Sequence, residues 1–305
     1  MFSGSITALI TPFRNGEIDW TAFDNLVEYQ IDQGTHGVVP CGTTGESPTL
    51  THDEHKRIVE RCIDIVKKRI PVIAGTGSNS TAEAVDFTTH AKNAGADAAL
   101  IVTPYYNKPT QDGLYAHYHH IASHVDIPII IYNIPGRSVI DMATETMGRL
   151  AQLPNIVGVK DATGDLSRVK KQQFSCGDDF CQLSGEDGMI YDYLDKGGHG
   201  IISVTSNIAP AQCAALHNAW QKGDKKTAKK IQTALMPLHD ALFCETSPQP
   251  VKYALSTIGL CTDEVRLPLV LASRAARKAV DDALYDLGMT ASPADAAVAA
   301  AQAHG

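Results

Sequence analysis

The chain reads AALIVTP at residues 98–104, PIIIYNIP at 128–135 and IVGVKDA at 156–162, with a helix-length segment in each gap. Each of these runs is too short for a helix and is rich in Val and Ile, as buried strands are. Strands that alternate with helices run parallel, because each helix returns the chain to the same end of the sheet. This part of the chain is therefore expected to form repeated strand–helix units.

Five more runs of the same kind are SITALIT (5–11), GVVPCG (37–42), PVIAGTG (71–77), CQLSGE (181–186) and HGIISVT (199–205). Helical segments are expected at 20–33, 51–66, 80–91, 111–125, 143–152, 165–175, 187–196 and 207–221. Thr51 with Glu54 and Ser80 with Glu83 have the spacing of capping boxes. Eight strand–helix units predict an α/β protein with a closed (β/α)8 TIM barrel over residues 1–222.

Residues 223–305 are predicted to be a C-terminal helical region that packs on the barrel. Pro237 lies inside one expected helix, and Pro250 and Pro268 mark the starts of others. The Ala-rich tail, residues 291–305, is expected to form a short helix or to fray. A doubly wound sheet is the rival architecture, but GTGSNS (75–80) lacks the third glycine of a dinucleotide fingerprint.

The composition is that of an ordinary globular protein, with 44% apolar and 20% charged residues among 305. The net charge of −8 and the lack of a Lys/Arg run argue against a nucleic-acid partner. No run approaches the ~20 apolar residues of a membrane span. The N-terminus has no basic residue before Arg14, which predicts a buried strand and not a signal peptide. Seven scattered cysteines without a C-x-x-C motif fit a reducing cytoplasm.

Polar residues follow the ends of five predicted strands, where barrel enzymes carry their sites. The segments are GTTGE (42–46), TPYYN (103–107), YNIPGR (132–137), KD (160–161) and SGED (184–187). We expect them to meet at one rim of the barrel.

Lys160 is the strongest candidate for a catalytic residue. The period of two in a strand puts Val157 and Val159 on the helix-facing side, and Gly158 and Lys160 on the inner side. Burial disfavours the charged form of an amine, and a neutral amine is a nucleophile that forms Schiff bases with carbonyl compounds. The alternative is a lysine that extends from the strand end to solvent.

Three other rim positions have residue types that suit such chemistry. Tyr132 ends the neighbouring strand, where its phenol could carry protons for an amine. Thr43 and Thr44 lie between glycines, in a turn that could bind a carboxylate. Arg137 could clamp a carboxylate with two hydrogen bonds. The alternatives are an ordinary barrel tyrosine, a plain turn and a surface arginine.

Two histidine-rich places remain ambiguous. His117, His119, His120 and His124 include pairs with metal-ligand spacing, but no further ligand is obvious, and a solvated helix face is favoured. A second group lies near the starts of two helices, where capping is the simpler interpretation. It comprises Pro48, His52, His55, Asn79 and Glu83.

The motifs GTTGES (42–47), PYYNKPTQ (104–111), YNIPGR (132–137), GVKDATGD (158–165) and SGED (184–187) occur in the order of a known family. Over residues 3–290 the chain resembles the dihydrodipicolinate synthase family, within the superfamily of Schiff-base lyases that includes N-acetylneuraminate lyase. The resemblance implies a class I aldolase-type condensation of pyruvate with L-aspartate 4-semialdehyde, in lysine and diaminopimelate synthesis. It also implies that the reaction needs no metal, flavin or nicotinamide.

The resemblance assigns catalytic roles by position. Lys160 matches the imine-forming lysine, and Tyr132 matches the proton donor and acceptor. Thr43 matches the hydroxyl that links this tyrosine to a second one, Tyr106, which reaches a neighbouring subunit's site. A dimer is then the smallest complete catalyst, and a homotetramer built as a dimer of dimers is implied.

The resemblance also assigns binding residues. Thr44, Gly185 and the backbone of Ile202 match substrate-binding positions, and Arg137 matches the arginine that receives the semialdehyde carboxylate. L-Lysine is implied as a feedback inhibitor, at positions matched by Pro48, His52, His55, Asn79, Glu83 and Tyr105.

Two alternatives stay open from the sequence. One is a lyase or aldolase of a sugar-derived 2-oxo acid, which the arginine at position 137 disfavours. The other is a barrel that binds pyruvate-like ligands without catalysis. The intact set of Lys160, Tyr132, Thr43 and Tyr106 argues against the second.

Overall fold

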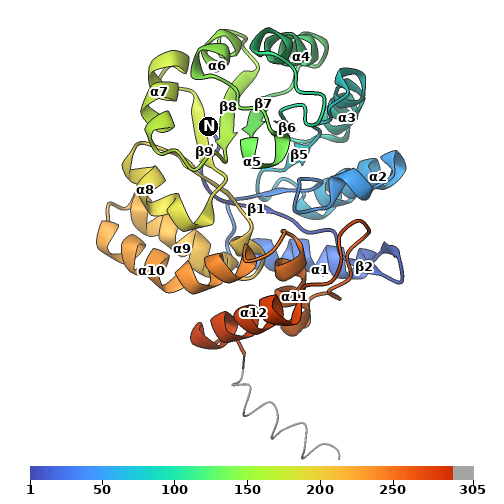
Figure 1. Cartoon of the computed structure of the whole chain (residues 1–305), viewed down its shortest axis with the longest axis vertical. Helices are drawn as coiled ribbons and strands as arrows, with labels where there is room; N and C mark the ends of the chain where they lie inside the picture. The colour runs from blue at the N-terminus through green and yellow to red at the C-terminus, as the bar shows by residue number, and fades with distance from the viewer. Residues whose placement is uncertain (291–305) are drawn as a thin grey trace, which may run out of the picture.

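The structure, a computed structural model, describes residues 1–290. In this part of the chain eight parallel strands form a closed barrel, as predicted (Figure 1). Their order is β4-β1-β10-β9-β8-β7-β6-β5, and a parallel bridge from Val38 to Val72 joins the two ends. The strands are β1 (Gly4–Ala8), β4 (Gly37–Val39), β5 (Ile73–Gly75), β6 (Ala98–Val102), β7 (Ile129–Asn133), β8 (Ile156–Asp161), β9 (Cys181–Ser184) and β10 (Gly200–Ser203).

Helices follow the strands and cover the outside of the barrel, close to the predicted ranges. They are α1 (Trp20–Asp32), α2 (His52–Val66), α3 (Thr81–Ala94), α4 (Gln111–His124), α6 (Thr144–Leu150), α7 (Ser167–Cys176), α8 (Ile190–Asp195) and α9 (Pro210–Gln221). Short elements that the sequence analysis did not predict are the hairpin of β2 (Phe13–Arg14) and β3 (Glu17–Ile18), η1 (Ser47–Thr49), α5 (Pro135–Ser138), η2 (Asp187–Met189) and η3 (Thr205–Asn207). Most of these short elements follow strand ends, and they shape the rim.

The two expected capping boxes differ. At α2 the box is complete: the Thr51 hydroxyl accepts from the Glu54 N–H, and the Glu54 carboxylate accepts from the Thr51 N–H at 2.8 Å. At α3 the Ser80 hydroxyl caps the Glu83 N–H, but the Glu83 carboxylate bonds His52 instead, at 2.7 Å. A tertiary contact thus replaces the local one that the sequence predicts.

The strand alternation predicted for β8 is broken at one residue. Val159 packs outward against the helices, as predicted, but Val157 packs against the inner cluster, so the prediction was wrong for Val157. The pairing with β7 shifts between Ile129 and Ile130, which makes Val157 the extra residue of a bulge. Beyond the bulge the register is regular, and it pairs Lys160 with Tyr132.

Up to residue 290, three helices follow the barrel: α10 (Lys225–Leu242), α11 (Gln249–Thr257) and α12 (Arg274–Asp286). They lie beside α1 and α9 in Figure 1. Side chains from all three share one buried cluster with α1 and α2; its members include Phe23, Leu26, Ile58, Leu238, Leu255 and Leu284. Apolar burial therefore holds the C-terminal helices on this side of the barrel.

The C-terminal prolines match the predictions in part. Pro237 lies inside α10, and Pro250 lies in the first turn of α11. Pro268 was expected to start a helix but lies in a turn, and α12 begins only after Ser273, whose hydroxyl caps it. The Ala-rich segment 291–305 lies outside the described residues. Within residues 1–290 each helix is too short or too polar to cross a membrane.

Candidate functional site

Lys160 points into the barrel near the C-terminal end of β8, as predicted. The residue is 5% exposed, and its Nζ atom lies 4.1 Å from the centre of the Tyr132 ring on β7. The face of an aromatic ring is negative and attracts a cation, so this contact offsets part of the cost of burying the amine. The alternative of a lysine extended into solvent is thereby ruled out.

Carboxyl groups around Lys160 differ in their environments. Burial raises the pKa of Glu186, neighbouring Asp187 raises it further, and Lys160 offsets part of this rise. Asp161, the residue after Lys160, instead accepts from Arg168 at 3.0 Å. The side chains of Lys160 and Asp161 thus point to opposite sides of β8: the amine lies inside the barrel, and the carboxylate pairs with an arginine of α7.

The loop after β4 carries Thr43 and Thr44. The Glu46 N–H donates to the Thr43 carbonyl at 3.1 Å, and the Thr11 hydroxyl donates to the Gly45 carbonyl at 2.7 Å. Thr44 is buried, while Thr43 is half-buried and lines a cleft. These two hydrogen bonds therefore hold the backbone of the loop that carries Thr43 and Thr44.

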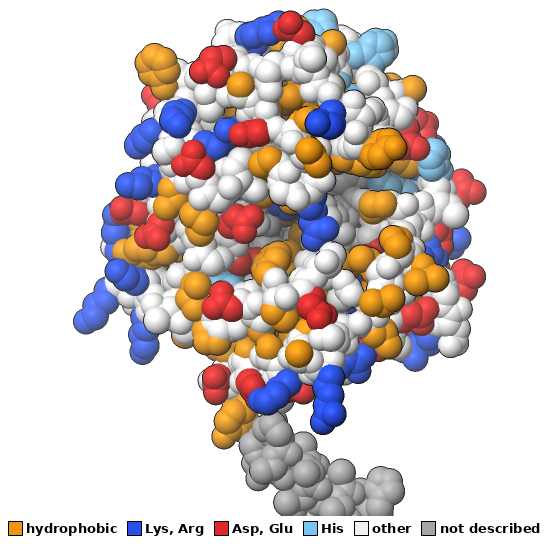
Figure 2. Space-filling model, viewed as in Figure 1, with side chains coloured by type: hydrophobic (Ala, Val, Ile, Leu, Met, Phe, Trp, Pro, Cys, Tyr) orange, Lys and Arg blue, Asp and Glu red, His pale blue; other side chains and the backbone are white. Residues whose placement is uncertain are grey.

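This cleft has a volume of about 230 Å³ and extends from the Thr43 loop to α5. Its lining includes Thr43, Ser47, Val102, Tyr105, Ile134 and Arg137. Figure 2 shows the face that carries α5 hollowed near its centre, with basic and hydrophobic side chains around the hollow. The exposed Arg137 donates to the carbonyl oxygen of Ser247 at 3.2 Å, which leaves most of its donors free for an anion.

Gly185 and Ile202 lie at the ends of the neighbouring strands β9 and β10. A Cβ atom at Gly185 would lie 2.6 Å from that of Ala162, so the chain passes close to the end of β8 there. The Asp187 carboxylate joins the two strand ends: it accepts from the Ser203 hydroxyl and from the Val204 N–H at 2.9 Å. Asp187 belongs to the SGED rim segment (184–187), but the sequence pattern predicts no role for it.

Tyr106 does not contribute to the buried site within one chain. It is 89% exposed and has a φ of 70°, a backbone conformation that non-glycine residues rarely adopt. Its side chain projects into solvent beside Tyr105, which lines the cleft. One chain therefore places Lys160 against Tyr132 and carries Thr43 and Thr44 in the loop after β4 at the same rim, whereas Tyr106 lies outside the buried site.

A second cleft, of about 360 Å³, lies next to the first. It is lined by all six residues of the predicted lysine site: Pro48, His52, His55, Asn79, Glu83 and Tyr105. Thr51 and Ser80 occupy the helix caps, so the capping interpretation of this group is wrong.

Hydrogen bonds order the second cleft. His52 bonds Glu83, and the Asn79 side chain donates to the Tyr105 carbonyl at 3.2 Å. The His55 ring stacks on Phe87 and bonds the Gly75 carbonyl through Nε2 at 2.8 Å. Burial lowers the pKa of His55 to about 4, so His55 is neutral near pH 7 and acts as the donor of this bond.

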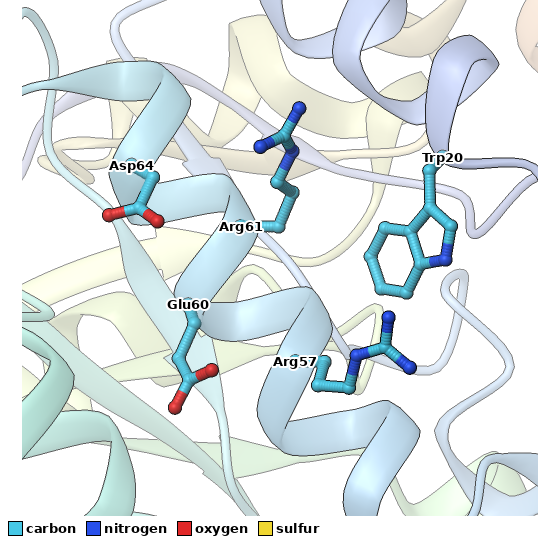
Figure 3. A pocket seen from close by; sticks show the side chains of 5 residues that line it. All are labelled: Trp20, Arg57, Glu60, Arg61 and Asp64. Carbon is cyan, nitrogen blue, oxygen red and sulfur yellow. The ribbon is translucent and has the colours of Figure 1, made fainter.

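Figure 3 shows a third cleft, between Trp20 and the outer face of α2. The Arg57 guanidinium lies 4.9 Å from the Trp20 ring centre, and Arg61 pairs with Asp24 at 2.8 Å. Both cations are thus already engaged, and we assign this cleft no functional role.

The histidine-rich helix α4 is only partly solvated. His117 is buried and bonds the Thr81 hydroxyl at 2.9 Å, so the predicted solvated face is wrong for this residue. His119, His120 and His124 are exposed. Across residues 1–290, His, Cys, Asp and Glu side chains do not gather in threes as a metal site requires.

The sequence profile of the dihydrodipicolinate synthetase family matches residues 1–287. The 4-hydroxy-tetrahydrodipicolinate synthase of Rhodospirillum centenum is 60% identical over 289 residues, which cover 95% of this chain and 99% of that protein. The chain belongs to the dihydrodipicolinate synthetase family. The resemblance inferred from the rim motifs is confirmed.

Solved structures of dihydrodipicolinate synthases have the same fold. The enzyme from Acinetobacter baumannii, solved in complex with pyruvate, is 45% identical with a TM-score of 0.93, covering 95% of this chain and all of that one. The enzyme from Cyanidioschyzon merolae, solved with lysine bound, is 36% identical with a TM-score of 0.92, covering 95% and 99%. These ligands are properties of those two proteins.

Proposed function

We propose that this chain condenses pyruvate with L-aspartate 4-semialdehyde to 4-hydroxy-tetrahydrodipicolinate, in lysine and diaminopimelate synthesis. The observation that carries the proposal is the buried amine of Lys160 beside the Tyr132 ring, inside the barrel rim. The names of relatives at up to 60% identity favour these substrates over a sugar-derived 2-oxo acid.

The mechanism follows from the chemistry of an amine in this place. The neutral amine of Lys160 adds to the ketone carbon of pyruvate, and water leaves as the imine forms. The protonated imine withdraws electrons, so a methyl proton is lost and an enamine results. The enamine attacks the aldehyde, and the amino group of the product then displaces Lys160 as the ring closes. Because the imine is the electron sink, this route requires no further cofactor.

Tyr132 is the residue we assign to proton transfer. Its ring contacts the Lys160 amine, which supports giving its hydroxyl the protonation of the carbinolamine oxygen that leaves as water. We assign Thr43 to connect this hydroxyl with Tyr106 of a neighbouring subunit. Such a chain would return the proton without access to bulk water.

Binding of the two substrates is assigned to different parts of the rim. Thr44, Gly185 and the Ile202 backbone, at the ends of strands near Lys160, are proposed to hold pyruvate. Arg137, in the open cleft, is proposed to receive the carboxylate of the semialdehyde, since a guanidinium binds a carboxylate through two parallel hydrogen bonds.

Incubation with pyruvate and borohydride is expected to leave one stable adduct on the peptide that carries Lys160, because borohydride reduces an imine to an amine. Intact mass and peptide mapping measure it. Lys160→Ala should lose the adduct, whereas Lys170→Ala, at an exposed lysine of α7, should keep it. A wild-type protein without adduct, or with the adduct elsewhere, would contradict the proposed function.

Arg137→Ala is expected to lower kcat/KM for the semialdehyde by about 10- to 100-fold, the equivalent of a charged hydrogen bond. Capture of pyruvate by borohydride should change by less than about threefold, since pyruvate binds elsewhere on the rim. Arg149→Ala, which removes an exposed arginine paired with Asp112, is the control. Equal losses in both measurements would refute the role of Arg137.

We propose that Tyr106 completes the site of a partner subunit within a homotetramer, a dimer of dimers. Its 89% exposure in the single chain supports this. Tyr106→Phe and Lys160→Ala subunits, each inactive alone, should then recover about a quarter of wild-type activity after random mixing, because mixed dimers contain one complete site. A mixture that stays inactive while sedimentation shows mixed dimers would rule this out.

We propose that L-lysine inhibits the enzyme by binding in the second cleft. There the Glu83 carboxylate can accept hydrogen bonds from an ammonium group, and the neutral His55 ring lines the cleft beside it. Millimolar lysine should slow the wild-type reaction, and Glu83→Gln should raise the half-inhibiting concentration about tenfold or more. Glu60→Gln disrupts a similar His–Glu pair, with His90 on the outer surface, and should not change inhibition. An unchanged rate in lysine would refute the proposal.

A further inference from the structure

Glu46 ends the loop that carries Thr43 and Thr44. An ion pair of its carboxylate holds it in place. The residue is 2% exposed and adopts a left-handed conformation with a φ of 55°. One carboxylate oxygen lies 2.5 Å from the Nζ atom of Lys252 on α11, and the other accepts from the Arg266 N–H at 2.9 Å. Both partners come from the region after the barrel.

Lys252 is completely buried. Its Nζ atom also donates to the Glu264 carbonyl at 2.7 Å and lies 4.0 Å from the centre of the Phe13 ring. Burial lowers the pKa of Lys252, and the charge of Glu46 opposes this shift. The ammonium group is thus held in α11 by the Glu264 carbonyl, in contact with one carboxylate.

Burying two charges to hold a loop has a high desolvation cost. A pair of apolar side chains of similar volume often stabilises a fold as well or better, because it carries no desolvation cost. An ion pair differs in that it holds the Glu46 carboxylate next to one particular amine, and the Arg266 N–H adds a hydrogen bond to the same group. Residues on both sides of Glu46 line the cleft that contains Arg137: Thr43 before it, Ser47 and Pro48 after it.

We propose that Lys252 is a positioning residue that acts through Glu46 to hold the Thr43–Thr44 hydroxyls toward Lys160 and Tyr132. The proposal rests on the proposed function, because it concerns the rate at which Lys160 captures pyruvate. It gives the C-terminal helices a part in forming the pyruvate site.

The experiment compares Lys252→Met, which keeps the stem and removes the charge, with Glu46→Gln, which is nearly isosteric. In variants whose far-ultraviolet circular dichroism matches the wild type, borohydride capture of pyruvate should be at least about tenfold slower, as misplaced groups commonly cause. Lys278→Met is the control, since it breaks an exposed ion pair with Asp282 that lies within α12 of the same C-terminal region. It should retain the wild-type capture rate within about twofold.

A double-mutant cycle with Thr44→Val tests whether Lys252 acts through the loop. If it does, adding Lys252→Met or Glu46→Gln to Thr44→Val should slow capture no further, whereas independent effects would multiply. Multiplied losses, or a folded Lys252→Met or Glu46→Gln protein with the wild-type rate, overturn the proposal. If Lys252→Met does not fold, Glu46→Gln carries both measurements. A wild-type protein without any adduct would instead refute the function on which the proposal rests.

Discussion

The arrangement of the site depends on the burial of one amine, that of Lys160, against an aromatic ring. Its Nζ atom lies 4.1 Å from the centre of the Tyr132 ring. A ring face attracts an ammonium less strongly than a paired carboxylate does. Asp161, which could have neutralised the amine, is paired with Arg168 on the other side of the strand.

The closed barrel makes this separation possible. Alternation along β8 sends Lys160 inward and Asp161 outward, and the register with β7 brings Tyr132 directly beside the lysine. A bulge at Val157 disturbs the lower part of the strand without changing the direction of Lys160. The prediction from alternation succeeded for Lys160, because the pattern holds over the last residues of the strand even though it fails at Val157.

Local patterns predicted the eight strands and the rim positions, but long-range partners left no signal in the sequence. The capping box at Thr51 needs only neighbouring residues and was predictable. Glu83 has the same spacing from Ser80, yet its carboxylate bonds His52, 31 residues away. Lys252 likewise belongs to no recognisable motif, and its role depends on how α11 packs against the barrel. A polar side chain can bond a neighbour in sequence or a residue far along the chain. The sequence does not show which partner it takes, because only the fold brings the distant residue close.

The first and second clefts share part of their lining. Ser47, Pro48, Gly77 and Tyr105 line both clefts. At Gly77 an added Cβ atom would lie only 2.4 Å from the Val102 nitrogen, so this shared lining is already packed to contact. The Tyr105 backbone is held from the second cleft by Asn79. Tyr105 therefore borders the first cleft and is hydrogen-bonded to a residue that lines the second. If ligands in the two clefts are coupled, linkage requires each to change the affinity of the other by the same factor.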